Sequence, residues 1–259
     1  MSAFTPERRV YSAYTDDFVQ SARQDYQLPE NYRWINRDFF FRFISVIVYL
    51  LTCLFGIIYC HVVLHMKIKN RRVLKAAGKN GYFLYGNHTQ PVGDVVIPAL
   101  VCWPKHIYTL ASTANYGIPL IGRLLPLLGA LPISSGRDSL GKLAAAVSTR
   151  YRENNSIVIF PEAHVWPYCT FIRPFPASSF RFPVQENAPS FCITSTYQKR
   201  RFGNKARLTL YVDGPFYPSE SGSAKQKREE LRDRIFACME ERSHNSSYAY
   251  IRYEEVRDA

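Results

Sequence analysis

A run of 24 residues without a charged side chain constrains this chain more than any other feature of its sequence. Between Phe43 and Met66 there is no Asp, Glu, Lys, Arg or Pro. As an α-helix this stretch would be roughly 36 Å long, enough to cross the hydrocarbon core of a bilayer. It begins too late to be a signal peptide, and no small-residue cleavage site follows it. The stretch therefore predicts a membrane-anchoring helix, with a buried core helix as the alternative.

Basic residues flank the apolar stretch on both sides, at Arg33, Arg37 and Arg42 before it and at Lys67, Lys69, Arg71 and Arg72 after it. The positive-inside rule therefore gives no orientation, and the anchor either spans the bilayer or is re-entrant or interfacial. The formal net charge of +12 indicates an anionic partner. Membrane lipid head groups meet that need, and no recognised motif supports binding to nucleic acid. We expect a membrane-associated protein whose domain after the anchor lies on the cytoplasmic face.

The region after the anchor alternates between short apolar runs and helical patterns. Strands are predicted at residues 82–86, 106–111, 130–134, 156–160, 190–195 and 207–213, and helices at about 138–151 and 223–242. This alternation predicts an α/β domain with a mainly parallel sheet that is covered by helices on both faces. We therefore divide the chain into a polar, aromatic arm (1–38), a membrane-anchoring helical segment (39–70) and the α/β domain (71–259).

The six cysteines contain no C-x-x-C pair, and most lie in apolar surroundings. This pattern is typical of buried, reduced thiols rather than of a disulfide framework or a zinc site. No metal site is predicted.

Two of the predicted strands end in titratable side chains. Asn87, His88 and Asp94 follow the strand at 82–86, and Pro161, Glu162 and His164 follow the strand at 156–160. Parallel sheets place their sites at the carboxyl ends of strands, where a histidine is able to deprotonate a substrate hydroxyl and an aspartate to orient it. The alternatives are a helix N-cap role for Asp94 and an ordinary loop position for His88.

In order and spacing these segments resemble the PlsC-type 1-acylglycerol-3-phosphate acyltransferases. Their first motif is N-H, four residues, then D, and this chain has NHTQPVGD, with five residues between. Their second motif has a G-x-x-x-I-x-R pattern, matched by Gly129, Ile133 and Arg137. Their third is F-P-E-G-T-R-S, of which Phe160, Pro161 and Glu162 remain. A membrane anchor before the motifs and a proline-containing strand after them, at 188–195, agree with the same family.

One departure bears on the acceptor. The family's arginine after F-P-E is missing, since His164 and Val165 follow Ala163 here. The family places that arginine near the acceptor phosphate, so Arg173 or His164 is expected to replace it.

The resemblance implies a mechanism without a cofactor beyond the co-substrate, acyl-CoA or acyl-carrier protein. His88, oriented by Asp94, would take the proton from a hydroxyl of a lysophospholipid, which we expect to be 1-acylglycerol-3-phosphate, so that the product is phosphatidic acid for phospholipid biosynthesis. Glu162 would hold the acceptor's glycerol or order its loop, and Arg137 would contact the phosphate with Arg173 as helper. Asn87, Pro161 and His164 complete the expected substrate contacts.

Two other functions fit part of the sequence. A non-enzymatic lipid-binding or scaffold protein would explain the anchor and the charge. GRDSLGKL at 136–143 has the G-x-x-x-x-G-K pattern of a P-loop nucleotide hydrolase, but Leu143 occupies the position of the magnesium-binding Ser or Thr.

Overall fold

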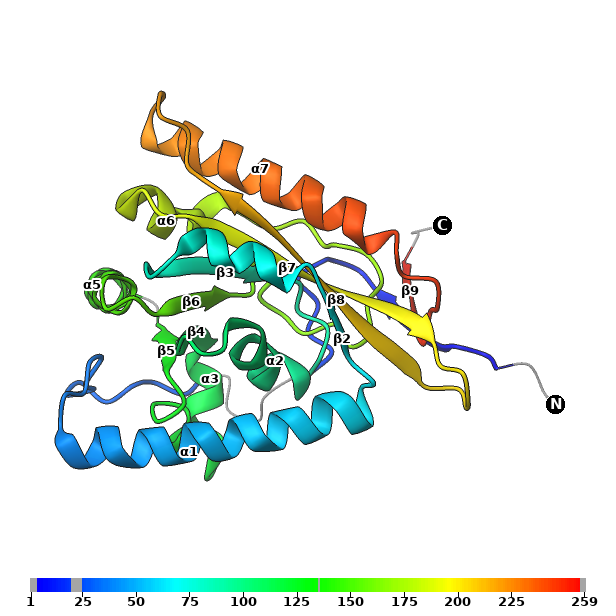
Figure 1. Cartoon of the computed structure of the whole chain (residues 1–259), viewed down its shortest axis with the longest axis horizontal. Coiled ribbons are helices and arrows are strands. Elements are labelled where there is room, and N and C mark those ends of the chain that lie inside the picture. The colour runs from blue at the N-terminus through cyan, green and yellow to red at the C-terminus, as the bar shows by residue number, and fades with distance from the viewer. Residues whose placement is uncertain (1–3, 20–24, 135, 257–259) are drawn as a thin grey trace.

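The computed structural model describes residues 4–19, 25–134 and 136–256 and is built around a seven-stranded sheet (Figure 1). The strands lie in the order β2-β8-β7-β3-β6-β4-β5. Neighbouring strands run parallel except β7 and β8, which form an antiparallel hairpin. The mainly parallel sheet expected from the sequence is therefore confirmed. The strands are β2 (Lys67–Lys69), β3 (Tyr82–Gly86), β4 (Ile107–Ser112), β5 (Ala130–Ile133), β6 (Ser156–Ile159), β7 (Ser190–Lys199) and β8 (Ala206–Phe216).

Helices cover both faces of the sheet, as predicted. One face packs against α1 (Phe39–Ile58), which continues as the π-helical turn η1 (Tyr59–Val63), and against α2 (Gly93–Cys102). The other packs against α5 (Arg137–Arg152), α6 (Arg181–Glu186) and α7 (Ala224–Ser243). Every residue of β3 is buried because successive side chains point to opposite, covered faces. Short helical turns complete the fold: η2 (Arg71–Ala77), α3 (Thr113–Tyr116), α4 (Ile121–Leu124) and η3 (Ala177–Phe180).

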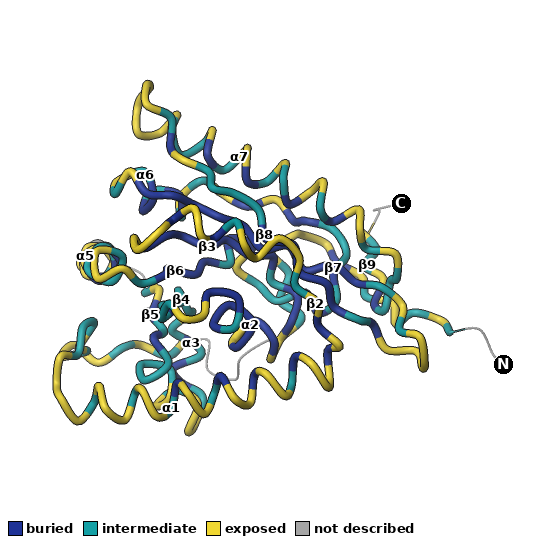
Figure 2. Tube along the Cα trace, viewed as in Figure 1, coloured by how far each residue is buried: buried dark blue, intermediate teal, exposed yellow. Residues whose placement is uncertain are grey.

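The apolar helix α1 lies along the globular domain. Its Ser45 hydroxyl donates to the carbonyl of Leu127, and the Tyr49 ring stacks on His106 with 4.2 Å between ring centroids. Gly56 lies against Val96 of α2 so closely that an added Cβ would come within 2.9 Å of the Val96 Cβ. The outward side of the helix is apolar and exposed (Figure 2). Among the described residues, one helix, Phe39–Val63, is both long enough and apolar enough to cross a membrane.

The N-terminal arm packs on the domain and carries a strand that the sequence did not predict. β1 (Glu7–Tyr11) pairs in parallel with β9 (Ile251–Glu255), near the other end of the chain. The Trp166 ring is buried between this small sheet and the loop after β6, and its Nε1–H donates to the carbonyl of Asp16. The seven-stranded sheet includes β2, which lies within the range expected to form the anchor (39–70). The globular domain therefore begins before residue 71.

Candidate active site

The loops after β3 and β6 meet at one edge of the sheet because these two strands are parallel neighbours. The backbone N–H of His88, two residues beyond β3, donates to Glu162 Oε2 at 2.9 Å. The backbone N–H of Trp166 donates in return to the carbonyl of His88. The two segments singled out from the sequence therefore form one site at the carboxyl ends of the strands.

His88 and Asp94 lie in direct contact at this edge, with 2.7 Å between His88 Nδ1 and Asp94 Oδ2. The same carboxylate oxygen accepts the backbone N–H of Gln90 at 2.9 Å. The alternative role of Asp94 as a helix cap is excluded, because α2 has its N-cap at Val92 with no side-chain cap bond. The five residues between His88 and Asp94 form a short turn that leads into the first turn of α2, and this turn accommodates the extra residue.

The surroundings of His88 fix its ring and its tautomer. A carboxylate only accepts hydrogen bonds, so Nδ1 is the donor to Asp94, and in the neutral ring Nε2 is the acceptor. Phe160 stacks on the ring with 4.5 Å between centroids. The side chain of His88 is 20% exposed and that of Asp94 is 4% exposed. Within the described part of the chain Nε2 has no hydrogen-bond partner, so it is open to a ligand.

Asn87 ties the loop after β3 to β7. Its side-chain amide donates to the carbonyl of Ser195 at 3.1 Å and its carbonyl oxygen accepts the Ser195 N–H at 2.8 Å. Both ends of the buried amide are therefore occupied, and these contacts do not support the prediction that Asn87 contacts the substrate. Its effect is to hold the residue next to His88 in place.

Glu162 and Arg173 form a buried ion pair behind His88. The Arg173 Nη2 donates to Glu162 Oε2 at 2.8 Å, and its backbone N–H donates to Oε1 at 2.9 Å. The Arg173 side chain is only 1% exposed and its guanidinium lies 4.7 Å from the Trp166 ring centre. This burial does not support the prediction that Arg173 helps to bind a phosphate. Of the two roles expected for Glu162, ordering the loop fits these contacts.

The rest of the F-P-E segment forms a tight turn. Pro161 is buried and has no N–H to offer, so the expected substrate contact by this residue is not supported. Ala163 has a φ of +66°, a conformation that favours glycine, which is the residue the resembled motif has at this position. His164 stays partly exposed, with its Nδ1 3.7 Å from Asp17 Oδ2 of the arm. It remains a candidate ligand contact.

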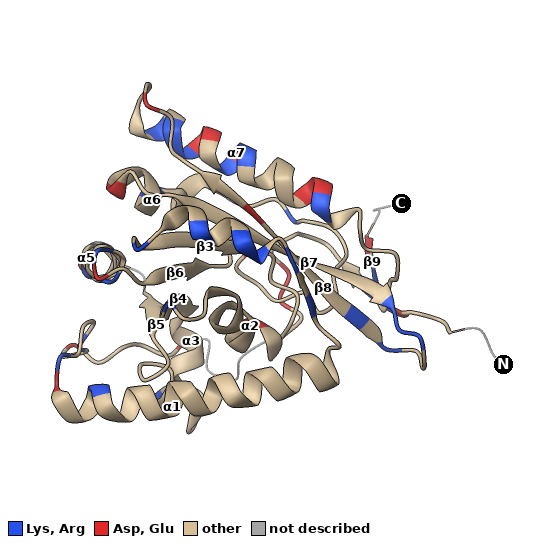
Figure 3. Cartoon of the chain, in the orientation of Figure 1, with Lys and Arg blue, Asp and Glu red and all other residues tan. Residues whose placement is uncertain are grey.

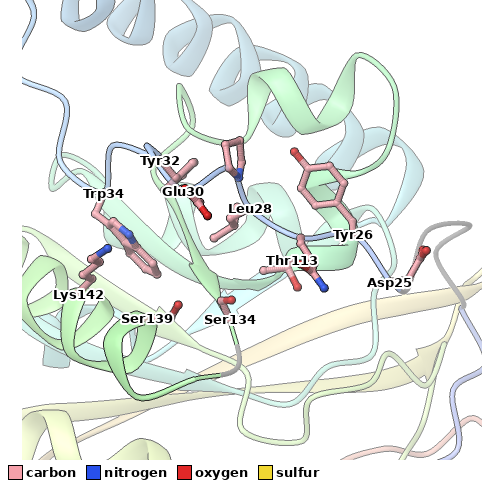
Figure 4. Close-up of a pocket in the computed structure, with 12 residues that line it drawn as sticks. Asp25, Tyr26, Leu28, Glu30, Tyr32, Trp34, Thr113, Ser134, Ser139 and Lys142 are labelled. Carbon is pink, nitrogen blue, oxygen red and sulfur yellow. The ribbon is translucent and has the colours of Figure 1, made fainter.

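Arg137 is the first residue of α5, directly beyond β5, and its side chain lies outside the described part of the structure. Gly141 and Lys142 lie inside α5 and not in a loop, so this segment is not a P-loop. A cavity of about 520 Å³ opens nearby, between the arm and the carboxyl ends of β4 and β5 (Figure 4). Thr113, Ser134, Ser139 and Lys142 line it opposite Tyr26, Tyr32 and Trp34 of the arm.

Tyr197 of β7 is a supporting residue that sequence reasoning missed. Its hydroxyl lies 2.7 Å from Thr89 Oγ1 and accepts the side-chain amide of Gln90 at 3.0 Å. Burial raises the pKa of Tyr197 well above its usual value, so the hydroxyl stays protonated. A tyrosine in an apolar strand gives no sequence signal for such a contact.

Together, the fold and the site define an α/β protein with a carboxylate-oriented histidine at the open edge of its sheet, beside an apolar helix. The acyltransferase family model matches residues 65–194, just over half of the 259 residues, and the chain belongs to that family. The expected resemblance to PlsC-type enzymes is confirmed for family and fold, and the chain is an acyltransferase.

A solved structure supports the fold. The chain is similar to the crystal structure of PlsC from Thermotoga maritima, a 1-acyl-sn-glycerophosphate acyltransferase, with a TM-score of 0.57 and 14% identity. The match covers 83% of this chain and 86% of that one. No curated protein matches the chain.

Proposed function

We propose that this acyltransferase is membrane-bound and moves an acyl group from acyl-CoA or acyl-carrier protein to a hydroxyl of a lysophospholipid, with His88 as the general base. The observation that carries the proposal is the 2.7 Å contact between His88 Nδ1 and Asp94, which leaves Nε2 open. The T. maritima enzyme is named for 1-acyl-sn-glycerophosphate. The same acceptor here would give phosphatidic acid.

In this mechanism the chain needs no covalent intermediate. The acceptor oxygen attacks the thioester carbonyl while its proton passes to His88 Nε2, and Asp94 stabilises the imidazolium that forms. The carbon–sulfur bond of the tetrahedral intermediate then breaks, and the proton on His88 passes to the leaving thiolate. A positioned general base typically contributes about 10²- to 10⁴-fold to the rate.

The arrangement of α1 supports an anchor that lies in the plane of the membrane. One side of the helix packs against α2 and the β4–β5 region, and the other exposes large apolar side chains. A helix with this division is suited to the bilayer interface, with its apolar side in the acyl region. Gly56 of α1 touches Val96, two residues beyond Asp94, so the anchor would hold the dyad near its lipid substrate. We place the catalytic domain on the cytoplasmic side.

The acceptor phosphate requires a cation, and Arg137 is our candidate. Arginine matches phosphate oxygens with two parallel hydrogen bonds. Arg137 follows β5, whose carboxyl end lies at the same edge of the sheet as His88. With Arg173 buried against Glu162, it is the remaining arginine of the two proposed from the sequence.

A product assay tests this function. Purified protein in phosphatidylcholine nanodiscs is incubated with labelled acyl-CoA or acyl-carrier protein and a panel of lysolipids, including one deoxy analogue without the acceptor hydroxyl. We expect a diacyl product from 1-acylglycerol-3-phosphate, less from zwitterionic lysolipids, and none from the deoxy analogue. Folded protein that acylates no lysolipid with either donor would contradict the proposal.

A further inference from the structure

One end of the molecule is strongly basic. Residues 39–93 and 187–212 contain no Asp or Glu, and the two segments are joined where β2 pairs with β8. Their lysines and arginines gather along this edge and on the β7–β8 turn (Figure 3). We define residues 199–205 of that turn as the basic tip, with the cations Lys199, Arg200, Arg201 and Lys205. Among the residues that the structure describes, none of these four forms an ion pair with a carboxylate.

The basic tip is fastened to the end of the apolar helix. The Arg200 guanidinium donates to the carbonyl of Val63, the last residue of η1, and its Nε donates to Ala206 at 2.9 Å. The N–H of Leu208 donates to the carbonyl of Leu64 at 3.1 Å. The hairpin therefore keeps a fixed place beside the C-terminal end of the anchor, as Figure 1 also shows.

Phe202 projects from the middle of the tip. Its side chain is 79% exposed, more than any other exposed large apolar residue of the described chain. The guanidinium of the neighbouring Arg201 lies 5.4 Å from the ring centre. A single exposed apolar residue needs no explanation by itself. An aromatic ring among unpaired cations, however, has the composition of a membrane-interface contact, because aromatic rings sit at head-group level and Lys and Arg attract anionic lipid.

We propose that the basic tip is a second membrane contact, which binds anionic phospholipid head groups through Lys199, Arg201 and Lys205 and inserts Phe202 at the interface. This rests on the proposed role of α1 as an in-plane anchor. An anchor along one helix leaves the domain free to tilt on the membrane. A second contact beyond the C-terminal end of that helix would limit the tilt and so help to set the height of the His88 edge above the lipid.

Site-directed fluorescence on the full chain tests this proposal. Five of the six cysteines are buried and the sixth is half-buried, so a new surface cysteine takes an environment-sensitive dye first. F202C is labelled in nanodiscs of phosphatidylcholine alone or with phosphatidylglycerol. We expect a blue-shifted emission and protection from a soluble quencher in anionic discs, and much less of either in neutral discs. L54C, on the exposed side of α1, is the control for a dye buried in the membrane. S221C, near the start of α7, is the control for a dye in water.

A charge variant then tests the cations. In the F202C background, K199Q/R201Q/K205Q is expected to raise the quenching constant in anionic discs at least about fivefold, because three attractive charges are lost. K225Q/K227Q/R228Q on α7 removes the same charge elsewhere and should change nothing. Equal protection of position 202 in both kinds of disc would overturn the anionic recognition. A protected L54C with an unprotected F202C would overturn the second contact, whereas loss of protection at both would mean that the anchor itself is wrong.

Discussion

The carboxylate of Glu162 connects the loop after β3 with the loop after β6. It accepts the backbone N–H groups of His88 and Arg173 and the Arg173 guanidinium. The loop that carries the proposed base is thus held by an ion pair that is buried at both partners. Removing one partner of such a pair leaves an uncompensated buried charge, so the position of His88 depends on two residues that are buried behind it.

Arg173→Met should therefore destabilise the fold by about 3–5 kcal/mol. The matched control is Lys225→Met, which breaks the pair between Lys225 and Glu229, both of them exposed, and is expected to cost no more than about 1 kcal/mol. Thermal unfolding in detergent compares the two. If Arg173→Met melted like the wild type and raised only the KM for the acceptor, a phosphate-binding role would be restored.

Arg137→Ala should weaken use of the acceptor by about ten- to a hundredfold. The reason is the loss of one charge-assisted hydrogen bond, worth roughly 1.5–3 kcal/mol, at about 1.4 kcal/mol per tenfold. The KM for the donor should change much less. Kinetics with acceptor and donor varied separately measure this. Equal effects on both substrates would point to a donor-phosphate contact or to misfolding.

Ala163 has a backbone conformation that suits glycine better, with φ at +66°. Left-handed conformations cost residues with a Cβ about 1–2 kcal/mol, and glycine gives back part of that in chain entropy. Ala163→Gly should therefore raise the free energy of unfolding by up to about 1 kcal/mol. The measurement is the melting temperature against wild type, with exposed Ala76→Gly as a control that lies in the helical turn η2. A lower melting temperature in both variants than in the wild type would show that Ala163 is not strained.

At the scale of elements, the docking of α1 depends on a few close contacts. Gly56 lets the helix approach α2, and Tyr49 stacks on His106 at the start of β4. Burial lowers the pKa of His106 from its usual 6.5 to about 4, with the nearby Arg150 adding to the shift. Between about pH 4 and pH 6.5 this ring is therefore neutral in the folded chain and protonated in the unfolded chain.

Acidification should loosen this part of the fold. The unfolded state binds a proton near pH 6.5 and the folded state only near pH 4, so stability is full above pH 6.5 and is lost as pH falls to 4. The loss is at most about 3.4 kcal/mol, at 1.36 kcal/mol for each pKa unit. Melting temperatures between pH 7.5 and 4 measure it, with His106→Phe as the comparison. A slope that is the same in both proteins would exclude His106 as its source.

At the scale of the whole molecule, the sheet was predictable wherever the sequence has strong periodicity. The six predicted strands correspond to β3 to β8, and the helical patterns to α5 and α7, because long apolar faces must be buried. The pairing of His88 with Asp94 was also expected, from strand ends and spacing. β1, β2 and β9 were missed because ERRVY, KIK and IRYEE are short and largely charged, so tertiary pairing alone makes them strands.

The site predictions that the observed contacts do not support share one physical cause. Arg173, Asn87 and Pro161 have side chains typical of ligand contacts or lie within a motif, but burial decides what they do. The contacts that bury them include residues distant in sequence, such as Ser195 for Asn87 and Tyr14 of the arm for Arg173. A single sequence shows which groups stand near a site and does not show which of them are already satisfied inside the protein.

The most direct measurement of the central claim is the rate of acyl transfer by His88→Ala in nanodiscs, with Asp94→Asn beside it. We expect a loss of at least about a hundredfold in kcat/KM for His88→Ala, the low end for removal of a general base, with an unchanged melting temperature. Asp94→Asn should also be strongly impaired, because Asp94 no longer stabilises the imidazolium. Near-normal transfer by a folded His88→Ala protein would contradict the account.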